Sequence, residues 1–179
     1  MPIGPLMIEH RLIERIIRLL KKELEQVGKL KKADPVFIEI AVDFMRSYAD
    51  RCHHGKEEDI LFRDLAKKGL SQEHRTIMEE LLDEHVRARK ATANLLEAKG
   101  RYSNGDTAAI RDIVDALTWL VNFYPIHIEK EDRQFFMPVM GYLSREEQDI
   151  MLQEFHEFDR NLIHAMYRGV IERLEKATG

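Results

Sequence analysis

The stretch HHGKEEDILF at residues 53–62 returns as HIEKEDRQFF at residues 127–136, 74 positions further along the chain. Each copy places a glutamate four residues after its first histidine. Residues i and i+4 lie on one face of an α-helix, so each copy projects an imidazole and a carboxylate in the same direction. The two pairs are His53 with Glu57 and His127 with Glu131. Because this His-x3-Glu pair occurs twice, we expect the chain to consist of helices.

The repetition extends upstream of this motif. Glu9-His10 returns as Glu84-His85, with an offset of 75. The repeated unit is therefore a helix with one histidine, followed by a helix with the His-x3-Glu pair. Two such units predict four helices that contribute to a common site.

Apolar periodicity and capping signals predict long helices, and no stretch alternates with the period of a strand. The second helix is expected to begin at Asp34-Pro35, a cap followed by proline at the first helical position. Gly100 is expected to end the third helix, and Ser144 with Glu147 forms a capping box for the fifth. The expected helices cover about 6–27, 35–68, 71–99, a segment from 106 onward, and 144–176.

These signals predict an all-α fold, an up-down-up-down four-helix bundle with an additional C-terminal fifth helix. We expect one domain over residues 1–179, with a metal-binding bundle at about 6–140 and the extra helix at about 144–176. In an antiparallel bundle, two residues are level when they are equidistant from the turn between them. The midpoints between successive histidines of the repeat fall in predicted turns, at residues 31–32, 69 and 106. The four histidines are therefore expected in one layer, with the glutamates about 5 Å away.

Six polar side chains lie on apolar faces of the predicted helices, and burying them without partners would cost several kcal/mol each. Two metal ions about 3.5–4 Å apart, bridged by the glutamates, would satisfy all six. The absence of thiolate fits iron or manganese, and also zinc. A core network of His–Glu hydrogen bonds is the alternative. The expected ligands are His10, His53, Glu57, His85, His127 and Glu131.

Other side chains near this motif have weaker expectations. Glu14, His54 and His156 are alternatives as additional ligands, although His54 is expected to turn about 100° away from His53 toward solvent. Tyr124 precedes His127 by one turn and is expected either in the core or lining a ligand pocket. The repeated acids Glu58 and Asp132 are expected on a solvated helix face.

The composition excludes several classes of protein. A net charge of −4 over 179 residues gives no basic face for nucleic acid. The single cysteine, Cys52, excludes disulfides within the chain and cysteine-rich metal sites. Charged residues interrupt the apolar N-terminal segment at helical spacing, so we expect no signal peptide, no membrane span and a cytoplasmic location.

From about residue 9 to residue 138 the chain resembles the haemerythrin family, and specifically the HHE cation-binding domains. The resemblance rests on His10, on HHGKEEDILF, on Glu84-His85 and on HIEKEDRQFFMP. It implies a four-helix bundle with a non-haem di-iron centre that binds dioxygen or related small molecules. Relatives carry oxygen, sense oxygen or iron, or serve nitric-oxide and oxidative stress responses, including iron–sulfur repair.

The chain departs from the oxygen carriers of that family at two places. Their third helix carries a His-x3-His pair, whereas the residues at that spacing from His85 are Leu81 and Arg89. Their last motif is His-x4-Asp, whereas this chain has His127-x3-Glu131. A fifth nitrogen ligand is therefore missing or comes from elsewhere, and the pattern is closer to the symmetric stress-response and sensor branch.

We therefore expect two iron ions, with zinc or manganese as alternatives, and a small exogenous partner such as dioxygen, peroxide or nitric oxide. Binding or sensing of that molecule is the first expectation, and a dedicated enzyme is not favoured. The alternative is a stress-response, iron–sulfur repair or iron-handling protein that uses the same centre for redox chemistry. A helical module with structural zinc is a weaker alternative, in which the fifth helix forms a homodimer surface.

Overall fold

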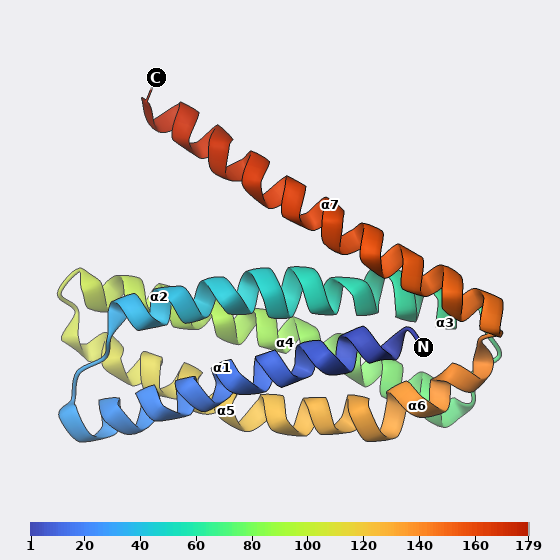
Figure 1. The fold of residues 1–179 in the computed structure, drawn as a ribbon. Helices are drawn as coiled ribbons and strands as arrows, with labels where there is room; N and C mark the ends of the chain where they lie inside the picture. The colour runs from blue at the N-terminus through green and yellow to red at the C-terminus, as the bar shows by residue number, and fades with distance from the viewer. Residues whose placement is uncertain (179) are drawn as a thin grey trace.

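The computed structural model describes the backbone of residues 1–178 and the side chains of residues 1–162 (Figure 1). The all-α class and the additional C-terminal helix are confirmed, because the described backbone contains helices joined by short turns and no strand. Most of the helical segments are α-helical, namely α1 Ile3–Leu30, α2 Pro35–Phe44, α3 Arg63–Leu65, α4 Gln72–Ser103, α5 Ile110–Lys130, α6 Phe136–Val139 and α7 Arg145–Thr178. Three segments are π-helical, η1 Met45–His54, η2 Glu57–Phe62 and η4 Glu131–Phe135. Two are 3₁₀ turns, η3 Thr107–Ala109 and η5 Met140–Tyr142.

Four long helical rods form the bundle. Helix α1, the continuous helix from α2 to α3, α4 and α5 lie side by side, and the chain direction alternates from one to the next (Figure 1). Helix α1 contacts α5, α2 contacts α4, and α4 contacts α5. Helix α7 starts at the end of the bundle where α6 and α3 lie, crosses the helix from α2 to α3, and extends away from it (Figure 1).

The predicted caps form where the sequence indicates them. The Asp34 side chain accepts hydrogen bonds from the backbone N–H groups of residues 36 and 37, at 2.9 and 3.1 Å. At the start of α7, Ser144 and Glu147 exchange hydrogen bonds between side chain and backbone, at 2.8 and 3.2 Å. These contacts satisfy N–H groups that have no partner within the helix.

The predicted end of the third helix is wrong. Helix α4 continues through Gly100 to Ser103. The chain then turns at Gly105, whose φ of +96° lies in the region that glycine adopts most readily. The turn at Gly105, and not Gly100, therefore ends the helix.

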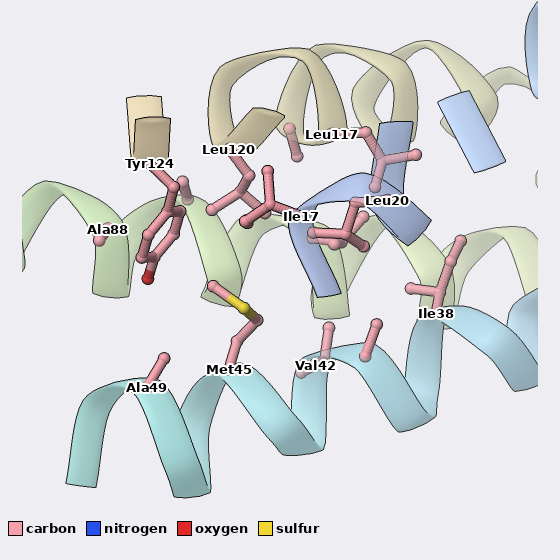
Figure 2. Packing of buried hydrophobic residues seen from close by; sticks show 14 of the residues in the cluster. Ile17, Leu20, Ile38, Val42, Met45, Ala49, Ala88, Leu117, Leu120 and Tyr124 are labelled. Carbon is pink, nitrogen blue, oxygen red and sulfur yellow. The ribbon is translucent and has the colours of Figure 1, made fainter. Parts of the chain in front are cut away.

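Two apolar clusters fill the bundle. The larger cluster lies between α1, α2, α4 and α5 and includes Ile17, Leu20, Val42 and Leu117 (Figure 2). The second lies toward the end that α7 covers, and contains residues of α1, α3, α4, α6 and α7. Buried polar side chains lie between the two clusters, so water is excluded from above and below them.

Helix α7 packs on the π-helical segments through its first half. Phe155 is buried in the second cluster, and the ring of Phe158 lies over Gly55, where an added Cβ would approach its Cζ atom to 2.7 Å. A glycine at this position therefore lets α7 approach closely. No helix in the described part of the chain is both long enough and apolar enough to span a membrane.

Candidate metal centre

Seven ligand-type side chains meet in the layer between the two apolar clusters. Each of the seven is at most 2% exposed to solvent. Within each of two groups, the nitrogen and oxygen atoms lie within 4.8 Å of one another. The first group is His10, His53, Glu57 and Glu131, and the second is His54, His85 and His127. The six side chains that the repeat predicted are therefore together, and His54 joins them.

In the first group, two imidazoles point at each other. The Nε2 atoms of His10 and His53 are 2.8 Å apart. The Nε2 atom of His10 lies 3.1 Å from Glu131 Oε2, and that of His53 lies 3.4 Å from Glu57 Oε1. Two nitrogens and one oxygen of each carboxylate thus converge on one point between three helical rods.

The second group uses the other oxygen of each carboxylate. Glu57 Oε2 lies 3.4 Å from His85 Nε2. Glu131 Oε1 lies 3.5 Å from His85 Nε2 and 3.3 Å from His127 Nε2. Both glutamates therefore reach nitrogens in both groups, which is the arrangement that a bridging carboxylate needs.

His54 was expected to face solvent, and this expectation is wrong. Its side chain is 1% exposed, and its ring stacks on that of His85 with 3.9 Å between ring centroids. The physical reason is the π-helical segment η1, whose wider turn reduces the angle between consecutive side chains. Both His53 and His54 can then face the core, and His54 brings a fifth imidazole to the converging side chains.

The four predicted histidines each have an acid behind the ring. In every case a carboxylate oxygen lies 2.7–2.9 Å from Nδ1. A carboxylate accepts hydrogen bonds, so each ring donates its Nδ1 proton and presents the Nε2 lone pair to the centre. The pairs are His10 with Asp132, His53 with Glu9, His85 with Glu58, and His127 with Glu84.

Each of these acids also contacts a cation. Lys130 lies 2.6 Å from its acid and Arg89 lies 2.8 Å from its acid, while Arg11 and Lys56 also pair directly with theirs. In every case the cation belongs to the same helical rod as the histidine, and the acid comes from another rod. Four His–acid–cation chains therefore cross between rods, and we call them the crossing chains: His10–Asp132–Arg11, His53–Glu9–Lys56, His85–Glu58–Arg89 and His127–Glu84–Lys130.

The sequence carries a signal for these acids. Glu58 and Asp132 were expected on a solvated face, and this is wrong, because each orients a histidine of the centre. Both repeat with the offset of 74, as do Lys56 and Lys130. Repeated positions that are not ligands themselves were the available sign of residues that support the ligands.

Two of the additional candidate ligands lie elsewhere. Glu14 is only half-buried and pairs with Arg11 at 2.8 Å. His156 is exposed on α7. Neither belongs to a group of converging ligand atoms among the described side chains.

The charges of the two buried carboxylates affect each other strongly. Burial and the nearby Glu131 charge raise the pKa of Glu57 well above its ordinary value. Burial also opposes ionisation of Glu131, but the neighbouring imidazoles of His127, His10 and His85 outweigh it and lower that pKa well below its ordinary value. Cations placed between the carboxylates would remove this conflict.

The imidazoles titrate unequally. Burial opposes a charge on His10, but the hydrogen bond with Asp132 and the nearby carboxylate of Glu131 outweigh it and raise its pKa to about 9. Burial and the charge on His10 lower the pKa of His53 to about 4. Burial and the charge on His85 lower the pKa of His54 well below its ordinary value, so His54 stays a neutral ring with a lone pair available to a metal.

Unpaired polar atoms test whether these residues fit metal ions. Eight buried side-chain atoms have no hydrogen-bond partner within the described structure. They are both ring nitrogens of His54, Nε2 of His85 and of His127, and both carboxylate oxygens of Glu57 and of Glu131. Such atoms cost free energy unless something satisfies them, and all eight belong to the seven converging side chains. A pair of cations fits this donor set, whereas a closed His–Glu hydrogen-bond network does not.

Comparisons with known proteins agree with this geometry. The model of the family described as Hemerythrin HHE cation binding domain matches residues 1–139. No curated protein and no solved structure matched the chain. The matched segment contains all seven converging side chains and all four crossing chains. The chain therefore belongs to the haemerythrin HHE cation-binding domain family.

Proposed function

We propose that the protein holds two iron ions between its four helical rods, and that it binds or senses a small exogenous molecule there. The observation that supports this most strongly is the position of Glu57 and Glu131, each of which reaches nitrogens of both groups. Two carboxylates placed in this way suit two ions and would be redundant for one.

The two ions would have different ligands. His10 and His53 would hold one ion and His54, His85 and His127 the other, with both glutamates shared. Imidazole and carboxylate without thiolate suit iron, and also manganese or zinc. The pair, when bound, supplies an electron-rich centre that takes up small molecules such as dioxygen, peroxide or nitric oxide.

Other residues of the chain orient the imidazoles, balance charge and exclude water. The crossing chains fix which nitrogen of each ring faces the centre, and their cations balance the acids behind the rings. The apolar clusters exclude water on both sides. Release of an ion would leave several buried polar atoms without partners, which favours a retained pair over a role in iron donation.

Metal analysis of protein produced in iron-supplied cells tests the proposal. We expect about two irons per chain, together with optical bands of an oxo-bridged pair after exposure to air. Glu57→Ala and Glu131→Ala should each lose the paired site. The matched controls are Glu14→Ala and His156→Ala, which should keep both ions because these side chains lie outside the centre. Stoichiometric zinc with no response to added ligands, or two ions in both glutamate variants, would contradict the proposal.

A further inference from the structure

Helix α7 lies outside the segment that the family model matches, yet it contacts the helical rod that carries His53. The match ends at residue 139, and α7 starts at residue 145. Helix α7 crosses the rod from α2 to α3 and contacts η1 and η2, which contain His53 and Glu57 (Figure 1). Side chains of α7 can therefore reach the residues that support the centre, although this helix is not part of the family domain.

Asp159 extends one of the crossing chains onto α7. Its Oδ1 atom lies 2.7 Å from Lys56 Nζ, and its Oδ2 atom lies 3.0 Å from the same nitrogen. Lys56 also pairs with Glu9. The other carboxylate oxygen of Glu9 accepts the Nδ1 proton of His53 at 2.9 Å. The chain behind His53 therefore has a fourth member, and this member lies on α7.

The cations of the other three crossing chains also contact a second acid each. Those acids, Glu14, Asp50 and Glu80, belong to the four rods of the bundle. Lys56 differs because its second acid comes from α7 and because its side chain is 0% exposed, whereas the other three cations are 19–55% exposed. Water can satisfy the N–H donors of an exposed cation, but a buried ammonium group depends on acceptors of the protein. Lys56 therefore depends on its second acid more than the other cations do.

Asp159 affects His53 through both the charge and the position of Lys56. Two carboxylates share one ammonium group, so Glu9 keeps more negative charge toward the ring of His53 than it would if Lys56 contacted Glu9 alone. A more negative acceptor behind the ring makes the imidazole a stronger metal ligand. Asp159 also holds Lys56 in place, and thereby the carboxylate of Glu9. Loss of the Asp159 charge should weaken metal binding by His53 for both reasons.

We infer that Asp159 is a positioning residue of the metal centre, and that α7 thereby raises the affinity for the ion that His10 and His53 would hold. The effect is reciprocal, because an ion that binds more tightly when α7 is docked also strengthens the docking of α7. The inference rests on the proposed metal pair and is independent of the small molecule that the pair binds. It adds a helix from outside the family domain to the residues that support the centre.

Stepwise titration with ferrous iron, without oxygen and against a chromogenic chelator, measures the affinity for each ion. Asp159→Asn keeps the shape of the side chain and removes its charge. It should weaken binding of one of the two ions by about tenfold, the lower end of the effect expected for residues that support a ligand. Asp159→Glu keeps the carboxylate and should recover most of this loss.

Glu154 provides a matched control on the same helix. Its side chain is 37% exposed and lies 2.7 Å from a cation of the neighbouring rod, Arg63. The corresponding values for Asp159 are 36% and 2.7 Å. Arg63 also pairs with Asp64 and belongs to no crossing chain. Glu154→Gln should therefore remove a comparable contact of α7 and leave both iron affinities unchanged.

Hydrogen exchange of the α7 backbone gives a second readout, which does not measure metal affinity. In the wild type and in Glu154→Gln, loading with ferrous iron should slow amide exchange around residue 159 by about tenfold, the same factor by linkage. In Asp159→Asn, loading should slow this exchange much less. The wild-type measurement needs no variant, so it tests the inference even if Asp159→Asn does not fold.

The outcomes separate this inference from the proposed function. A wild-type protein that holds no iron pair contradicts the proposed function, and the inference with it. For a loaded wild type, the inference alone is overturned if Asp159→Asn binds both ions as tightly, or if Glu154→Gln loses as much affinity as Asp159→Asn. A loss that Asp159→Glu does not recover also overturns it, as does α7 exchange that loading leaves unchanged in the wild type.

Discussion

Lys56 and Lys130 occupy equivalent positions of the repeat, yet we expect very different effects when each is changed to methionine. Lys56 is completely buried and contacts both Glu9 and Asp159. Removing one member of a buried ion pair leaves uncompensated charge and costs about 3–5 kcal/mol. Since Asp159 is itself partly exposed, we expect the lower end, about 3 kcal/mol for Lys56→Met. Lys130 remains 19% exposed beside Glu80 and Glu84, and such pairs contribute about 0–1 kcal/mol.

Unfolding of both variants is compared without metal, in the presence of a chelator, because bound ions would add their own stabilisation. For a chain of this length, 1 kcal/mol shifts Tm by about 2–4 °C. Lys56→Met should therefore lower Tm by about 6–12 °C, and Lys130→Met by at most about 4 °C. Circular dichroism on heating, with urea titration as a second measure, gives both values. Equal losses in the two variants would refute the reasoning from burial.

Further predictions concern α7, the acids behind the rings, and the cysteine. Gly55→Ala gains helix propensity, but the added methyl group meets the ring of Phe158. The substitution should therefore stabilise a Phe158→Ala background by about 1 kcal/mol and fail to stabilise the wild type. A double-mutant cycle by urea titration measures both effects, and equal effects in the two backgrounds would exclude the contact. Glu84→Ala should weaken metal binding by about 10- to 100-fold, because the imidazole of His127 loses the acid that orients it. The control Glu80→Ala removes an exposed acid and should leave the affinity unchanged. Competition with a chromogenic chelator measures both affinities, and equal values would contradict the role of Glu84. Burial raises the pKa of Cys52 to about 12, so the thiolate forms only near that pH. Alkylation of Cys52 at pH 8 should therefore be about 10³-fold slower than alkylation of a free thiol. An alkylation rate near that of glutathione would contradict this prediction.

Much of the architecture could be predicted from local chemistry. The caps at Asp34 and Ser144 depend on contacts within four residues, so the sequence alone specifies them. The layer of histidines followed from the duplicated spacing, because two units with equal lengths must place equivalent residues level with one another.

The rest depends on interactions between helices. His54 faces the core because η1 is π-helical. Such turns are rare, so helical periodicity in a sequence is read with the α-helical angle between residues. The burial of Lys56 depends on Asp159, more than 100 residues away on α7. Gly100 and Gly105 are both credible ends for α4, and the choice between them depends on how α5 begins.

The crossing chains show how closely the molecule approaches two-fold symmetry. Two of them join residues within one repeat, and the other two join the first repeat to the second, through Asp132 and Glu58. A chain of half this length would thus contain one copy of each type of histidine, acid and cation, and two such chains related by a two-fold axis would form all four crossing chains. The symmetry fails at one decisive position, because the residue equivalent to His54 is Ile128. One ion would then have three imidazoles and its neighbour two, so the pair should be electronically unequal, with separate reduction potentials and a stable mixed-valence state.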